Sequence, residues 1–378
     1  MKKQKTGWFV SALAATAGAA LLLGYSSAAA EGARRGLAAV GEVILPSVFP
    51  FLVFSVFLVS SPAGAALGRI LSRPAAHCYR LPEAAAPALL PGLIGGYPAG
   101  AGALAELLGE GKITREDARF GALCLVHCGP AFLTGAVGEH LFGSTLTGIF
   151  LFLTQLAAGL LSARILMLVL RRPPVTKAPA CITRPKYDPF PVRLLHAVAA
   201  ASSVTLKITA FVVLCSAASE ILTASGVFPL LMQGLARLSG GRLAGETARC
   251  HLTGLLEVSA GTSMAAGLPP AEAAKILPFL LSFGGLSVML QAAAPFEEGV
   301  FPWGRFFLSR LLHGTLTALL ARPWLPGRAA VGAMTGQPEL AVGGGKLLWG
   351  CCTMLLLTLM LSVRWEAGER AGKTEKSP

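Results

Sequence analysis

Apolar runs close to the length of a membrane span recur along this chain of 378 residues. A helix needs about 20 such residues to cross the hydrocarbon core of a bilayer. Overall, 54% of the residues are hydrophobic and only 13% are charged, which is outside the range of soluble globular proteins. The sequence therefore predicts an all-α, polytopic membrane protein, since helices satisfy their own backbone groups in lipid.

The apolar run 87–108 is interrupted at its centre by Pro91, Gly92, Gly95, Gly96 and Pro98. Proline removes a backbone donor and glycine weakens a helix, so we expect the middle of this run to be unwound. Unwound backbone at membrane depth is tolerated where protein or a watery cavity satisfies its polar groups. We interpret this segment as the first half of a substrate site.

The formal net charge of +13 comes from basic residues in short loops between the apolar runs. This placement is typical of cytoplasmic loops, and no aromatic-basic module accompanies it, so no nucleic-acid partner is predicted. Basic residues on both flanks of 87–108 indicate a re-entrant hairpin entered from the cytoplasm. The basic, proline-rich stretch 171–193 is interpreted as a cytoplasmic linker between two halves.

The second half repeats the pattern of the first half. Residues 208–215 resemble 49–56, and residues 254–263 resemble 92–101. Residues 282–288 likewise resemble 127–133. The segment 252–268 is then the partner of 87–108, entered from the opposite side. Paired broken helices in opposite orientation are typical of inverted-repeat transporters, and about eight transmembrane helices plus two re-entrant hairpins are expected.

Five regions follow from this pattern. They are an uncleaved N-terminal transmembrane helix (1–36), a first repeat (37–170), the linker (171–193), a second repeat (194–320), and a C-terminal transmembrane helix with a charged tail (321–378). The weak point is the arginines at 237, 242 and 249, which this topology puts outside, against the positive-inside bias.

Ionisable residues inside membrane runs are costly, so each is a candidate for function. Glu257, in the second broken segment, could bind a cation or proton or a substrate; the alternative is a carboxyl satisfied by local hydroxyls. Lys207 is either a snorkelling interfacial residue or a counter-ion for an anionic substrate. His127 precedes a Gly-Pro break and is either a titrating group or a structural residue.

The backbone itself is a candidate site. A half-helix that starts after Gly95 and Gly96 directs free N–H groups and its positive end into a cavity, which suits a carboxylate. The opposite half-helix is expected to do the same from 261–263, so the pair suits a compact, doubly charged ligand. The predicted substrate-binding set is Gly95, Gly96, Tyr97, Pro98, Gly129, Pro130, Lys207, Glu257, Ser259, Gly261, Thr262, Ser263, Ser287 and Gln291, with Glu257 and His127 as coupling candidates.

Enzyme motifs are not found in the sequence. Residues 261–265 nearly match Gly-x-Ser-x-Gly but end in alanine, and neither a phosphate-binding Gly-x-x-x-x-Gly-Lys loop nor His-Glu-x-x-His occurs. Cys124, His127 and Cys128 are close in sequence, but small buried hydrophobes are a better interpretation than metal ligands. We expect no enzymatic activity, no cofactor and no metal.

Four stretches, 45–53, 92–101, 128–138 and 281–288, resemble the YlbJ-type sporulation integral membrane proteins, in the nucleoside-recognition (Gate) domain group. The resemblance covers about residues 41–320 and makes both repeats Gate-like. It implies a role in endospore formation, in which dipicolinic acid crosses the outer forespore membrane. One departure is the sequence Val126-His127-Cys128 before Gly129-Pro130, where the family usually has asparagines.

These observations predict a multi-pass protein of the bacterial cell membrane, in the outer forespore membrane of sporulating cells. Its expected function is secondary transport or facilitated passage of a small anion, dipicolinate first. The alternatives are a non-transporting scaffold or subunit of a sporulation complex, and a nucleoside-type transporter. The expected partners are the small anionic substrate and the lipid bilayer, and homo-oligomerisation is left open.

Overall fold

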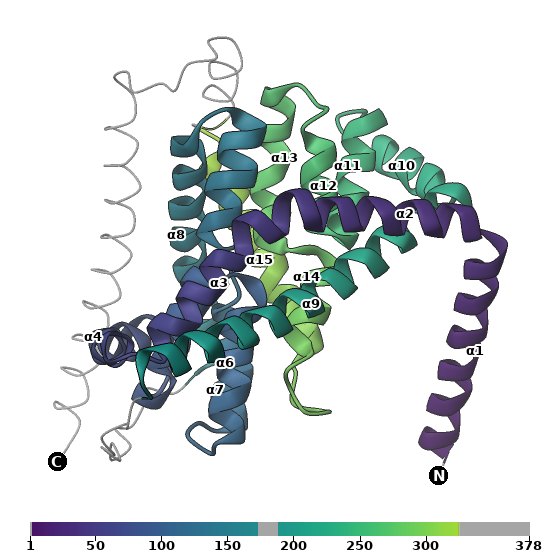
Figure 1. The fold of residues 1–378 in the computed structure, drawn as a ribbon. Helices are drawn as coiled ribbons and strands as arrows, with labels where there is room; N and C mark the ends of the chain where they lie inside the picture. The colour runs from purple at the N-terminus through teal and green to yellow at the C-terminus, as the bar shows by residue number, and fades with distance from the viewer. Residues whose placement is uncertain (1, 173–187, 324, 326–378) are drawn as a thin grey trace, which may run out of the picture.

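The computed structural model describes residues 2–172, 188–323 and 325. Within these ranges the chain forms helices and no β-strand, which confirms the all-α prediction (Figure 1). Most of the linker and the expected C-terminal transmembrane helix lie outside the described residues.

The N-terminal region is not one helix but two. Helix α1 (Lys2–Gly24) ends before Tyr25, and α2 (Ser26–Ala39) turns back over the rest of the molecule (Figure 1). A π-helical turn, η1 (Val40–Ile44), joins α2 to α3 (Leu45–Val59). The predicted boundary at residue 36 therefore falls inside a helix.

The first repeat contains two interrupted helices followed by a long one. Its elements are α4 (Pro62–Tyr79), η2 (Glu83–Ala88), α5 (Leu89–Ile94), α6 (Tyr97–Gly109), α7 (Arg115–Cys124), the π-helix η3 (Phe132–Leu141) and α8 (Thr145–Val169). The break expected within 87–108 falls at Gly95 and Gly96, between α5 and α6. A second break, at residues 125–130, separates α7 from η3, as the Gly-Pro pair predicted.

The segment predicted as the second repeat also contains interrupted helices. It consists of α9 (Phe190–Ala224), α10 (Val227–Leu238), α11 (Gly245–Leu256), α12 (Val258–Ala265), α13 (Pro270–Phe283), α14 (Gly285–Ala293) and α15 (Trp303–Ala321). Glu257 separates α11 from α12, and Gly284 separates α13 from α14. In Figure 1, α6 and α7 occupy the lower part of the molecule, whereas α11, α12 and α13 occupy the upper part.

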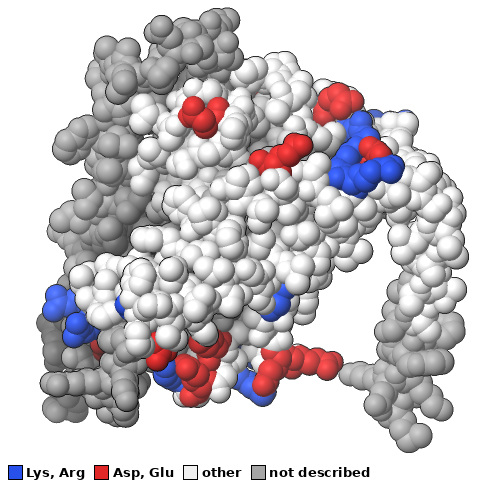
Figure 2. Space-filling view, viewed as in Figure 1, with Lys and Arg blue, Asp and Glu red and all other residues white. Residues whose placement is uncertain are grey.

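Three helical stretches in the described residues are long and apolar enough to cross a membrane. They are α8, α9 and the α13–α14 pair (Pro270–Ala293), and α3 with α4 makes a fourth if that pair, bent by 76°, is one span. This count covers only the described residues, so it leaves out the expected C-terminal span. In Figure 2, charged residues gather at the upper and lower edges and leave a largely uncharged band between them.

The core is formed where the long helices of the two repeats meet. Helices α8, α13 and α15 pack together, while α2 and α3 lie against α9 across the face seen in Figure 1. On α9, Leu206 is 71% exposed and Leu214 is 58% exposed, whereas Ile208 and Val212 are buried. Because exposed leucines on a long apolar helix are stable in lipid, this outer side of α9 is a lipid-facing surface.

Candidate functional site

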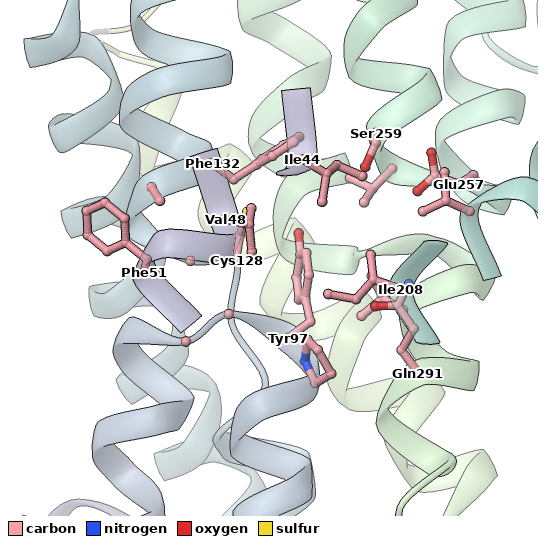
Figure 3. Close-up of a pocket in the computed structure, with 18 residues that line it drawn as sticks. Ile44, Val48, Phe51, Tyr97, Cys128, Phe132, Ile208, Glu257, Ser259 and Gln291 are labelled. Carbon is pink, nitrogen blue, oxygen red and sulfur yellow. The ribbon is translucent and has the colours of Figure 1, made fainter. Parts of the chain in front are cut away.

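A small cavity of about 60 Å³ lies between the two repeats. Figure 3 shows Tyr97 in its centre, with Val48, Phe51 and Phe132 on one side and Ile208, Glu257 and Ser259 on the other. The lining residues are Ile44, Val48, Phe51, Gly95, Gly96, Tyr97, Pro98, Cys128, Gly129, Ala131, Phe132, Ile208, Val212, Glu257, Val258, Ser259, Val288 and Gln291.

Three glycines contribute backbone to the first-repeat wall, beside side chains from η1, α3 and η3. Gly96 adopts φ 83° and ψ −171°, a conformation essentially restricted to glycine, and α6 begins at the next residue. A Cβ on Gly100 would lie 2.8 Å from the Cα of Gly92 and would overlap the carbonyl oxygen of Leu125. Glycine at these positions therefore allows α5, α6 and the residue 125–130 break to approach closely, with the positive end of α6 at the cavity.

The second-repeat wall contains an acidic side chain. Glu257 is extended, with φ −143° and ψ 112°, and its carboxylate accepts a hydrogen bond of 2.5 Å from the backbone N–H of Ala260. Its side chain is only 1% exposed. A Cβ on Gly261 would lie 2.8 Å from the nitrogen of Gly254, so the close crossing of α11 and α12 also needs glycine. Glu257 thus both starts α12 and faces the cavity.

The prediction that a second half-helix starts at 261–263 and receives an anion is wrong. The helix starts earlier, and a carboxylate already caps its first turn. Helix α12 begins at Val258, not after 261–263, because the extended Glu257 acts as its N-cap. The carboxylate already occupies the N–H groups of this helix end. Helices α6 and η3, by contrast, both begin at cavity-lining residues and have no side-chain cap.

Eight of the predicted site residues line the cavity: Gly95, Gly96, Tyr97, Pro98, Gly129, Glu257, Ser259 and Gln291. Six do not: Pro130, Lys207, Gly261, Thr262, Ser263 and Ser287. The Thr262 hydroxyl donates to the Val258 carbonyl at 2.7 Å inside α12, and Ser287 accepts a hydrogen bond of 2.9 Å from Gln291. Lys207 is exposed beside Leu206 on the lipid-facing side of α9, which favours the snorkelling interpretation.

His127, a predicted coupling residue, lies behind the cavity wall. It is 1% exposed, and its ring packs edge-to-face on His313 with a centroid distance of 5.2 Å. Nearby Arg310 is also 1% exposed and was not singled out in the sequence. It donates to the carbonyls of Leu123, at the end of α7, and of Val126, just after α7, more than 180 positions earlier in the chain.

Sequence reasoning also missed the apolar lining from η1, α3 and α9: Ile44, Val48, Phe51, Ile208 and Val212. A signal was available, because residues 208–215 and 49–56 resemble one another in the two halves. Equivalent helices of two repeats that precede equivalent breaks are expected to cover the same cavity from related positions.

In the part of the chain that the structure describes, the fold is that of an all-helical, polytopic membrane protein with a cavity between two sets of broken helices. The chain is similar to the sporulation integral membrane protein YlbJ of Bacillus subtilis, with 26% identity over 330 residues, 79% of this chain and 78% of that protein. The similarity confirms the resemblance stated from the motifs and supports a location in the membrane. No family model and no solved structure matches the chain.

Proposed function

We propose that this protein is a secondary transporter or facilitator of a small anionic solute, with dipicolinate as the first candidate, in the outer forespore membrane of sporulating cells. The observation that carries the proposal is the cavity itself, where the breaks of both repeats meet at Gly96 and Glu257. Broken helices that meet around a small cavity are characteristic of secondary transporters.

The lining of the cavity suits a compact anion. Most of it is apolar, and its polar groups are few: the uncapped end of α6, the Tyr97 hydroxyl, the Cys128 thiol, Ser259, Gln291 and the Glu257 carboxyl. A carboxylate of the substrate is stabilised at the positive end of α6, whereas Glu257 on the opposite wall repels a second carboxylate unless one of the two is protonated. Glu257 is therefore the group through which proton movement accompanies the anion.

The placement of the hairpins supports alternating access. The connection between α6 and α7 lies at the lower end of the molecule and that between α12 and α13 at the upper end (Figure 1). We interpret the halves as inverted repeats whose breaks act as hinges around the cavity. The bilayer is the only other partner that the proposal needs, and it involves no enzymatic step, cofactor, metal or nucleic acid.

Uptake of labelled dipicolinate into vesicles that contain the purified protein tests this proposal. Wild-type protein should transport the label, and Glu257→Gln should reduce the rate at least about tenfold and change its dependence on a pH gradient. Glu246→Gln, an exposed carboxylate on neighbouring α11, is the matched control and should transport normally. Uptake equal to empty vesicles would refute the proposal in favour of a scaffold, and uptake only of a nucleoside would redirect it to that class.

A further inference from the structure

Arg310 of α15 is buried, with only 1% of its surface exposed. Its guanidinium donates hydrogen bonds to the carbonyl oxygens of Val126 and Leu123, the latter at 2.9 Å. No ion pair among residues 2–172, 188–323 and 325 involves it, and its Nε has no hydrogen-bond partner there. A buried charge of this kind is costly unless something compensates it.

Two further side chains complete a polar cluster around the same segment. His313 accepts from Arg310 through Nδ1 at 3.3 Å and donates from Nε2 to the Gln155 carbonyl at 3.0 Å. The Gln155 side chain binds both backbone groups of Cys128, accepting from its N–H at 3.3 Å and donating to its carbonyl at 2.9 Å. Helices α8 and α15 thus satisfy the backbone that the break between α7 and η3 leaves without helical partners.

This cluster lies directly behind the first-repeat wall of the cavity. Cys128 and Gly129 line the cavity, two and three positions after the Val126 carbonyl that Arg310 holds. Because the carbonyls of Leu123, Val126 and Cys128 are engaged by Arg310 and Gln155, they are turned away from the cavity. The negative end of α7 offsets part of the guanidinium charge, and the remainder adds to the positive end of α6.

We infer that Arg310 is a positioning residue for an anionic occupant of the cavity: it holds the 123–128 backbone in place and makes this wall electropositive. The inference rests on the proposed function, since it requires that the cavity binds an anion. The positive charge that attracts the anion is therefore that of Arg310, which lies beside the cavity wall. Lys207, the candidate from the sequence, faces lipid instead.

The test combines hydrogen exchange with ligand binding on the full-length protein in lipid nanodiscs. Arg310→Gln should speed amide exchange in 123–128 about tenfold or more, because two carbonyls lose their donors. The same variant should weaken dipicolinate binding at least about tenfold and the neutral diamide of the same shape far less. Arg310→Lys should keep the preference for the anion but lose the backbone protection, since an ammonium cannot reproduce the two-branched contact.

Arg305→Gln, an exposed arginine on the same helix, is the matched control and should leave both readouts unchanged. Equal weakening of the dianion and the diamide, or unchanged exchange in 123–128, would overturn the inference. If Arg310→Gln does not fold, amide exchange and ligand binding measured on Arg310→Lys test the inference. Wild-type protein that binds neither compound would instead refute the proposed function, while the exchange measurement still tests the positioning role.

Discussion

The two walls of the cavity come from equivalent breaks but present opposite chemistry. In each repeat, a pair of glycines allows two half-helices to cross closely, Gly92 with Gly100 and Gly254 with Gly261. Between them, the first repeat has glycine at the break and exposes backbone, whereas the second has Glu257 and exposes a carboxyl. The glycine pairs therefore hold the half-helices together, whereas the residue at each break determines which chemical group the wall presents to the cavity.

The second break of each repeat differs in how it is supported. Residues 125–130 are held by side chains of Gln155 and Arg310 from other helices. The break at Gly284 and Gly285 instead depends on two glycines with φ 85° and 75°. A segment held by several side chains resists movement more than one held by two glycines and the single hydrogen bond from Tyr97 to the Leu281 carbonyl, so we expect the α13–α14 break to be the more mobile hinge.

The largest expected effect tests whether the crossings are equivalent. Gly100→Ala and Gly261→Ala should each destabilise the protein by about 3 kcal/mol or more, because the new methyl group overlaps backbone that cannot move away. Yield and thermal unfolding in detergent measure this. Gly102→Ala is the control, since nothing lies within 4 Å of its added Cβ. Normal stability of one crossing variant would show that the two repeats are not held in the same way.

A smaller loss of stability is expected when the side chain that supports residues 125–130 is removed. Gln155→Leu leaves the N–H and carbonyl of Cys128 without their partner, which should cost roughly 2–4 kcal/mol of stability. Gln291→Leu in the other repeat removes only the bond to Ser287 and should affect ligand binding more than the unfolding temperature. Equal losses of stability in the two variants would contradict the asymmetry.

The break of the first repeat should be sensitive to a single methyl group. Gly96→Ala forces alanine into a backbone conformation that costs about 1–3 kcal/mol, although the nearest atom to its Cβ, the Gly129 nitrogen, is 3.5 Å away. Transport should therefore fall more than stability does. A variant with unchanged uptake would mean that the geometry of this wall does not matter for the solute.

The weakest effect concerns one of the hydrogen bonds between the two repeats, the one made by Tyr97. The Tyr97 hydroxyl at the start of α6 donates to the Leu281 carbonyl of α13. Tyr97→Phe should cost about 1 kcal/mol, measured as a small decrease in unfolding temperature, and should raise the transport rate if this bond must break in each cycle. A large loss of stability would indicate that the repeats depend on this contact far more than on their glycine crossings.

Much of this organisation could be predicted because proline, glycine and buried charge act locally. The presence of a break within 87–108 and within 252–268 was predicted from such signals. The start of α12 was missed because an extended glutamate can cap a helix with its own side chain. The Arg310 cluster was missed because its partners are 184 and 187 positions away, and only packing of α15 against α7 and α8 joins them.

The central claim is that the solute occupies the cavity between the two repeats. Ile208→Trp fills this cavity from α9, whereas Leu206→Trp places the same ring on the lipid-facing side of the same helix, where Leu206 is 71% exposed. With vesicles that contain equal amounts of each protein, uptake of labelled dipicolinate should be abolished by Ile208→Trp and retained by Leu206→Trp. Wild-type rates in the Ile208→Trp vesicles would contradict the account.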